Sequence, residues 1–262
     1  MDLNRSPSRL GGVALPLVAL GVFLTVWALS ARYGSWEHSL FPGPLAALLA
    51  IWRLALSGEL WPAVWATVRR LLYGLGGSLV LGAALGFLMA RFVPLRRALK
   101  PYLLGLQSLP GMAWVPIAVV WFGFGESFYV FVTLIGSVFA ATLLFTEAIA
   151  GVPPGFAQVA QTMGARGFTL VSTVAIPAAL PSMLIAVRQT WSFAWRSLIG
   201  AEIVVASVGL GFLLLAGRDA LDTAQIFAVM LVTLAVGILF EVVLFAGAER
   251  WLARRWGLAH GR

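Results

Sequence analysis

EAIAGVPPGFAQVAQTMGARGF, residues 147–168, is a short polar stretch that separates two long apolar ones. Pro153 and Pro154 favour the start of a helix, because the first helical turn needs no backbone donors. Gly164 and Gly167 favour its end, because glycine accepts the left-handed backbone common at helix C-termini. The stretch therefore predicts a helix of about two turns, which is too short to be stable alone in water.

The predicted helix has one apolar face. Its members are spaced at i, i+3, i+4 and i+7, and they are Phe156, Val159, Ala160 and Met163. Because so short a helix is stable only when this face is buried, two interpretations are open. The face packs on the rest of its own chain, or it inserts into a groove of a partner protein.

The composition is that of an integral membrane protein. Of the 262 residues, 61% are hydrophobic and 11% are charged, whereas soluble domains average roughly 45–50% apolar and about 25% charged residues. The mean hydropathy is +0.95. The net charge of +8 does not indicate nucleic-acid binding, because the basic residues are scattered among apolar stretches. It indicates the orientation of the chain in a membrane.

The sequence lacks the motifs of several catalytic classes. It has no cysteine, which excludes disulfides, thiolate metal sites and cysteine nucleophiles. Its one lysine, Lys100, follows Leu99 rather than the glycine of a phosphate-binding loop, and neither H-E-x-x-H nor G-x-S-x-G occurs. His38 and His260 are far apart and do not suggest a metal site. We expect this chain to bind no metal or cofactor and not to be an enzyme; if transport is ATP-driven, ATP and Mg are used by another subunit.

Six apolar stretches are long enough to cross a bilayer as helices. The six predicted spans are residues 12–31, 63–90, 101–122, 127–150, 177–200 and 224–248. Residues 45–56 predict a short interfacial helix, and residues 249–262 predict a basic amphipathic tail. Together with the loop at 151–168, these elements make one all-α transmembrane domain over residues 1–262.

The first span has a second interpretation. Arg5 and Arg9 precede it, and Ala28-Leu29-Ser30 is a weak cleavage site, as in a signal peptide. The apolar stretch, however, exceeds the roughly 7–15 residues usual in signal peptides. We interpret it as a retained transmembrane helix.

Six spans with both termini on the cytoplasmic side give a consistent distribution of charge. Most basic residues fall on that side, including the cluster from Arg91 to Lys100. Arg69 and Arg70 fall on the other side, at a helix end from which their side chains could reach the interface. The outer side is favoured by carboxylates, which are Glu37, Glu59, Glu126, Glu202, Asp219 and Asp222.

Two spans carry patterns that bear on packing. Small residues recur every fourth position in the second span, as Gly74, Ser78, Gly82, Gly86 and Ala90. Such a stripe predicts a face on which another helix approaches closely, since glycines that are merely tolerated would not recur so regularly.

The third span contains prolines and an aromatic residue that we take as pathway candidates, namely Pro110, Trp114 and Pro116. Interior prolines free carbonyl groups that need protein or water as partners, so we expect a kinked, internal helix near the transport path.

The fifth span carries the charged residues of interest. Gln189, Ser192 and Arg196 share one face, and Arg188 shares a second face with two tryptophans. The first face either lines a path and attracts an anion, or is structural, with Arg196 reaching outward or pairing with Glu202. Arg188 is interpreted as structural.

The loop resembles the EAA loop of ABC importer permeases. Gln158-Val159-Ala160 is followed after three residues by Gly164, and Ile176-Pro177 comes later. The family pattern has Glu-Ala-Ala at the first three positions, so Gln158 and Val159 are departures that affect a salt bridge but not the apolar face. In that family the loop is a coupling helix that docks into the ATPase. The resemblance implies an ATPase-coupling site, made of Phe156, Gln158, Val159, Ala160, Met163, Gly164 and Pro177.

Four further segments are similar to the permeases of the nitrate, sulfonate and taurine importer group. They are Leu40-Phe41-Pro42-Gly43-Pro44, Ser108-Leu109-Pro110-Gly111-Met112-Ala113-Trp114-Val115-Pro116, Trp121-Phe122-Gly123-Phe124-Gly125-Glu126 and Ala194-Trp195-Arg196-Ser197-Leu198-Ile199-Gly200-Ala201-Glu202. The resemblance implies a type I ABC importer permease fold in a bacterial inner membrane. It also implies a second permease copy, two cytoplasmic ATP-binding subunits and an external substrate-binding protein.

Two other function classes are weighed against this one. A secondary transporter driven by an ion gradient would usually show an internal repeat, and the sequence shows none. A membrane-embedded enzyme would need a catalytic cluster, which is missing. The transported solute is expected to be a small anion of the sulfonate, taurine or nitrate class, with another small solute such as a pyrimidine precursor as the alternative.

Overall fold

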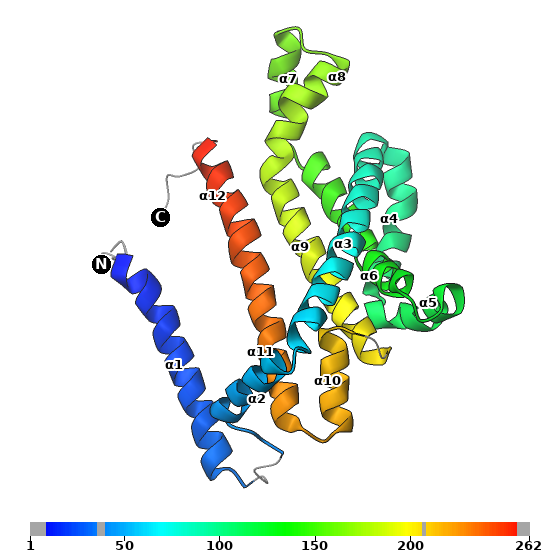
Figure 1. Cartoon of the computed structure of the whole chain (residues 1–262). Coiled ribbons are helices and arrows are strands. Elements are labelled where there is room, and N and C mark those ends of the chain that lie inside the picture. Colours follow the sequence, from blue (N-terminus) through cyan, green and yellow to red (C-terminus); the bar gives the residue numbers. More distant parts are fainter. Residues whose placement is uncertain (1–8, 36–39, 206–207, 256–262) are drawn as a thin grey trace.

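The computed structural model describes residues 9–35, 40–205 and 208–255 (Figure 1). All regular elements in these ranges are helical, which confirms the all-α class. In chain order they are α1 (Arg9–Tyr33), α2 (Pro44–Leu56), α3 (Leu60–Arg91), α4 (Val93–Ser108), η1 (Gly111–Trp114), α5 (Val115–Phe122), α6 (Glu126–Ala150), α7 (Pro154–Thr162), α8 (Gly167–Leu170), η2 (Val171–Ala175), α9 (Ile176–Val204), α10 (Leu210–Asp219), α11 (Thr223–Phe240), η3 (Glu241–Phe245) and α12 (Ala246–Arg255).

The centre of the bundle is the packing of α3 and α9 against α6. The small residues of α3 face α6, as their spacing predicts. A Cβ atom added to Gly74 would lie 2.5 Å from Cβ of Thr133, and one added to Gly86 would lie 2.7 Å from Cβ of Phe145. Gly82 lies in the same way against Ala141. The two helices therefore approach closely because one of them has almost no side chains along its contact face.

A second close approach joins α6, α9 and the segment after α4. Ser197 of α9 is wedged between Gly111 and Gly136, and a Cβ atom added to Gly136 would lie 2.8 Å from Cβ of Ser197. Both glycines are therefore required for the serine to fit. This wedge fixes the position of the neighbouring residues of α9.

The third predicted span is sharply bent at a proline, as predicted, but it is two helices rather than one kinked helix and begins before residue 101. Helix α4 begins at Val93 rather than Pro101, and the pair Val93–Ser108 and Gly111–Phe122 is bent by 95°. Leu109 adopts an extended backbone, as residues before a proline prefer, and Pro110 has no N–H group to continue the ladder. Pro101 is accommodated inside α4.

The count of membrane-crossing helices also differs from six. Among the described residues, four helices are long and apolar enough to cross a membrane, and a bent pair adds a fifth if it is taken as one span. Helix α9 is not among them, because its charged residues Arg188, Arg196 and Glu202 lower its hydropathy. Its 29 residues nevertheless extend about 43 Å, and it lies in the centre of the bundle (Figure 1).

The sixth span and the tail form one helical rod. Residues Thr223–Leu252 are continuous through the π-helical segment η3, so the described part of the tail extends the last span. The predicted tail at 249–262 is helical as far as Arg255 and continues the last span without a break, its interfacial position stays a prediction, and residues 256–262 lie outside the described ranges.

Helix α1 stands apart from the bundle and touches it near one end (Figure 1). There the Trp27 Nε1 donates a hydrogen bond to the carbonyl of Pro42 at 3.0 Å, and the Trp27 ring stacks on Phe227 at 5.6 Å. Elsewhere its large side chains are exposed. This surface suits lipid rather than water.

Candidate functional sites

The predicted short helix is present and lies at one end of the molecule (Figure 1). Helix α7 begins at Pro154 and is closed by two hydrogen bonds, from the amide of Ala165 to the carbonyl of Ala160 at 2.9 Å and from the amide of Gly164 to the carbonyl of Gln161 at 3.0 Å. This pairing is a Schellman motif, in which the residue after the cap is left-handed. Gly164 has φ +89°, so the backbone reason for a glycine here is confirmed.

Most of the apolar face of α7 is uncovered. Phe156, Val159 and Met163 are 55%, 61% and 83% exposed, whereas Ala160 is 8% exposed and packs on its own chain. The grouping of Ala160 with an outward face is therefore wrong. A hollow borders this face and is lined mainly by α7 residues together with Val174 of η2.

The other predicted coupling residues lie on either side of this face. Gln158 is exposed on α7. Pro177 is half-buried in the first turn of α9, beyond η2. The exposed face is thus continuous with the turn that returns the chain to the bundle.

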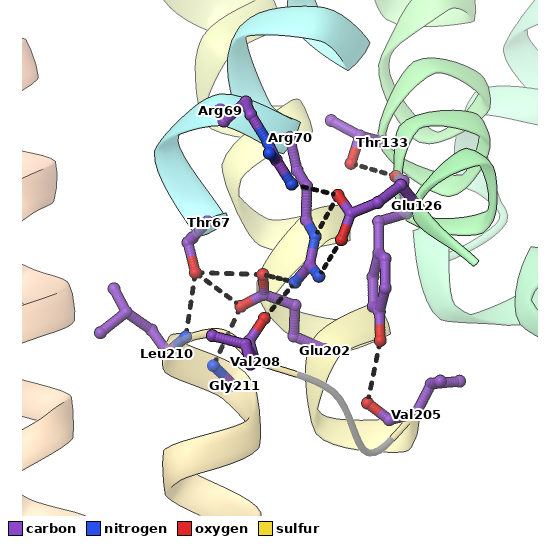
Figure 2. Close-up of polar contacts among 11 residues, drawn as sticks. Thr67, Arg69, Arg70, Glu126, Thr133, Glu202, Val205, Val208, Leu210 and Gly211 are labelled. Atoms are coloured by element: carbon purple, nitrogen blue, oxygen red, sulfur yellow. Dashed lines mark hydrogen bonds and ion pairs between the residues drawn. The ribbon is translucent and has the colours of Figure 1, made fainter. Parts of the chain in front are cut away.

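A buried ionic network joins α3, α6 and α9 (Figure 2) and lies near the end of α9 that is farther from α7 along the helix. Its centre is Arg70 of α3, whose side chain is 1% exposed and whose guanidinium donates to Glu202 at 2.8 Å and to Glu126 at 2.6 Å. The guanidinium also lies 3.8 Å from the centre of the Tyr129 ring and donates to the carbonyl of Val208. One cation thus joins α3, α6, α9 and the segment before α10.

Glu202 completes the network from the side of α9. It accepts hydrogen bonds from the Thr67 hydroxyl at 2.8 Å and from the Gly211 amide at 3.0 Å. The Thr67 hydroxyl oxygen in turn accepts from the amide of Leu210 at 2.9 Å. Every buried charge is paired and hydrogen-bonded, as a buried ion pair must be if it is not to destabilise the fold.

This network corrects two expectations from the sequence. Glu202 pairs with Arg70 and not with Arg196, and Arg70 is buried rather than extended to the interface. The sequence contained one indication that Arg70 is buried. Arg70 lies four residues before Gly74, so it shares the face of α3 that carries the small-residue stripe. Its partners could not be identified in this way, because Glu126 and Glu202 are 56 and 132 positions away.

The bend between α4 and η1 lies beside α9 and borders an open hollow whose lining is mainly apolar but includes several polar side chains. The hollow has a volume of about 340 Å³. It is lined by Gln107, Ser108, Leu109, Pro110, Gly111, Met112, Gly136, Phe193, Arg196 and Ser197. Two pathway candidates, Pro110 and Arg196, are therefore brought together.

The remaining pathway candidates lie elsewhere. Trp114 packs against Phe139 with ring centres 6.1 Å apart, and Pro116 is in the first turn of α5. Gln189 is exposed on α9, and the Ser192 hydroxyl donates to the backbone of its own helix.

Several other charges have structural partners. Arg188 pairs with Glu241 and Glu249, which confirms its structural interpretation, and Lys100 pairs with Glu147 at 3.2 Å.

The carboxylates expected on the outer side are partly engaged. Asp222 pairs with Arg53 at 2.5 Å and caps α11 by accepting from the Gln225 amide. Burial raises the pKa of the Asp222 carboxyl, but the Gln225 amide and the Arg53 guanidinium outweigh it and hold this pKa below its ordinary value. Asp219 pairs with its neighbour Arg218. Glu37 lies outside the described residues.

The sequence matches a known protein family and several of its relatives. A family model described as binding-protein-dependent transport system inner membrane component matches residues 79–257. A probable ABC transporter permease protein of Brucella melitensis is 30% identical over 94% of this chain and 99% of its own length. The putative aliphatic sulfonates transport permease protein SsuC of Escherichia coli is 30% identical over 90% of this chain and 89% of its own.

Two further relatives extend the comparison. The taurine transport system permease protein TauC of Escherichia coli is 29% identical over 95% of this chain and 90% of its own. Among solved structures, a chain of the MetNI methionine ABC transporter in an inward-facing conformation superposes with a TM-score of 0.63 at 19% identity. The superposition covers 76% of this chain and 96% of that chain. The fold is therefore that of an ABC importer permease.

Proposed function

The chain belongs to the family of binding-protein-dependent transport system inner membrane components, and from this premise we propose that it conducts a small anion through a bacterial inner membrane as the permease subunit of an ATP-driven importer. The solute class comes from relatives named for aliphatic sulfonates and taurine. Nitrate and other small solutes are the alternatives, and measuring uptake of each solute distinguishes them. The chain itself hydrolyses nothing and holds no cofactor.

The observation that supports this proposal best is the exposed apolar face of α7. Phe156, Val159 and Met163 project from one end of the bundle with more than half of each side chain exposed. Apolar side chains on so short a helix are favourable only if a partner buries them. A groove on a cytoplasmic ATPase subunit is the partner that fits, and α7 then acts as the coupling helix.

The complete importer then contains further chains. Each permease presents one α7, so two permease copies serve two ATPase subunits, with both chain termini on the cytoplasmic side. The network end of the bundle faces outward, where an external binding protein delivers the solute. Glu59, which is exposed, and the partly exposed Glu126 lie at this end.

The coupling role is tested by capture of the ATPase in detergent. Met163→Asp places a carboxylate in the proposed contact, and we expect it to lower recovery of the co-expressed ATPase at least tenfold, because a charge would be buried without a partner. Gln161→Asp is the matched control, since Gln161 lies on α7 with an exposed side chain off the apolar face. Full recovery with Met163→Asp would contradict the proposal.

A further inference from the structure

Two arginines on α9 have opposite surroundings. Arg188 lies between the carboxylates of Glu241 and Glu249. Arg196, two turns further along, forms no ion pair within the part of the chain that the structure describes, and its Nε donates only to the carbonyl of Ser192, at 3.1 Å. A cation in a central helix of a membrane protein is costly unless it meets a compensating charge or water. Arg196 therefore lacks a counter-charge among residues 9–35, 40–205 and 208–255.

The position of Arg196 is fixed by its neighbours. The next residue, Ser197, is wedged between Gly111 and Gly136. The Arg196 guanidinium carbon lies 5.0 Å from the centre of the Phe193 ring, which favours a cation over the ring face. The side chain of Arg196 is exposed, and its guanidinium borders the hollow beside the helix bend and lies near the Phe193 ring.

The hollow offers a second donor and an apolar wall. Gln107, near the end of α4, is half-buried, and its side-chain amide forms no hydrogen bond with the other described residues. Leu109 and Met112 also line the hollow. The site therefore combines one full positive charge, one neutral amide and a short apolar surface.

We propose that this hollow is a binding site of the permease itself for a small organic monoanion, with Arg196 and Gln107 contacting its oxyanion head and the apolar wall contacting its short aliphatic part. The proposal rests on the permease function argued above. A guanidinium presents paired donors that match two oxygens of a sulfonate or carboxylate. One cation without a carboxylate partner neutralises one negative charge, so a monoanion fits better than a dianion. A volume of about 340 Å³ lies at the lower end of the range of small-molecule pockets and has room for a small organic anion.

Transport by the complete importer tests this site. The permease, its ATPase and its binding protein are reconstituted in liposomes, and uptake of radiolabelled ethanesulfonate is measured. We expect Arg196→Gln to lower uptake at least tenfold, since a hydrogen bond to a charged group is worth a factor of about 10 to 100. Arg196→Lys keeps the charge but loses the paired donors, so it should retain more uptake than Arg196→Gln. Gln107→Leu should lower uptake by a factor of about three, as a single neutral hydrogen bond does.

Arg97→Gln is the matched control. Arg97 is exposed on α4 and forms no ion pair with other described residues, so its loss removes one positive charge from the chain without touching the hollow. Uptake by Arg97→Gln should stay within twofold of the wild type. Uptake by Arg196→Gln at the wild-type level would overturn the site.

A lipid phosphate is the other source of the same chemistry, and a binding measurement separates the two. In maltoside detergent, which carries no phosphate, ethanesulfonate should raise the unfolding temperature of the permease–ATPase complex, and Arg196→Gln should abolish this rise. If phospholipid and not ethanesulfonate stabilises the complex through Arg196, the solute site is refuted.

The two proposals fail in different ways. Loss of the ATPase from wild-type complexes would refute the permease function. Import of neutral or cationic solutes alone, with the ATPase bound and active, would refute the anion site while the permease function stands.

Discussion

At the scale of single residues, Gly164 has a left-handed backbone after α7, and Arg70 carries a charge buried between three helices. Gly164 was predicted to be left-handed because it follows a short helix, and it is. Arg70 was expected at an interface, yet it is the largest fully buried side chain. The difference is physical, because a helix-ending glycine is a local property while the partners of a buried cation come from distant parts of the chain.

Gly164→Asp should separate coupling from folding. An aspartate at φ +89° costs about 1 kcal/mol or more, and the added Cβ atom meets nothing within 4 Å in this chain. We therefore expect insertion and dimerisation to persist while ATPase attachment or uptake is lost, measured by co-purification and transport in reconstituted membranes. Gln158→Glu, which restores the family residue, is the tolerated control. Normal uptake by Gly164→Asp with its ATPase fully bound would refute the coupling-helix interpretation.

Arg70→Met should destabilise the bundle strongly. Removing one partner of a buried ion pair leaves Glu202 unpaired and costs about 3–5 kcal/mol, which corresponds to a fall of roughly 6–20 °C in the apparent unfolding temperature in detergent. Arg69→Met is the matched control, since the Arg69 side chain is 42% exposed and pairs with the half-exposed Glu126. If both substitutions lowered the unfolding temperature equally, the buried Arg70–Glu202 pair would stabilise the fold no more than the exposed Arg69–Glu126 pair.

At the scale of elements, the sequence predicted which face of a helix packs against a neighbour better than it predicted where a helix ends. The stripe on α3 was identified from its period of four, and its partner α6 was not, because Thr133 and Ala141 have no distinguishing pattern of their own. The third span was predicted as one helix kinked by its interior prolines, whereas the structure has two helices there. The Leu109-Pro110 step that breaks it was visible in the sequence, but the size of the bend, 95°, was not, because it depends on how distant parts of the chain pack.

Gly82→Ala should weaken the pairing of α3 with α6, although alanine favours helix by about 1 kcal/mol over glycine. The new methyl group would overlap Ala141, and such overpacking typically costs about 1–3 kcal/mol. Gly76→Ala, on the same helix with nothing within 4 Å, should be neutral or stabilising. The measurement is thermal unfolding of both variants in detergent. Rescue of Gly82→Ala by Ala141→Gly would confirm the contact, and equal behaviour of the two single variants would contradict it.

At the scale of the whole molecule, the exposed surface indicates that the chain functions within a larger assembly. Apolar side chains are exposed on α1 and on the rod from Thr223 to Leu252, where lipid or another copy can cover them. The sequence predicted membrane insertion from composition alone. It could not predict which surfaces face lipid, because that depends on how the helices pack in the complete importer.

The assembly should contain two copies of this chain. A type I importer joins two ATPase subunits, and each permease offers one α7, so symmetry favours an isologous pair with the pathway on its two-fold axis. Native mass measurement of the purified complex is expected to give two permease and two ATPase chains. A complex with one permease per ATPase pair, and no second permease subunit, would be incompatible with this arrangement.

The continuity of α9 has a mechanical consequence. The helix follows the turn after α7 at one end and carries Glu202 of the buried network near the other. Ser197 lies about 31 Å from the α7 end of this helix and about 10 Å from the other, so a tilt of about 5° around it moves the α7 end by about 3 Å and the far end by about 1 Å in the opposite direction. We therefore expect α9 to act as a lever that pivots at the Ser197 wedge, so that displacement of its α7 end moves the Glu202 end in the opposite direction.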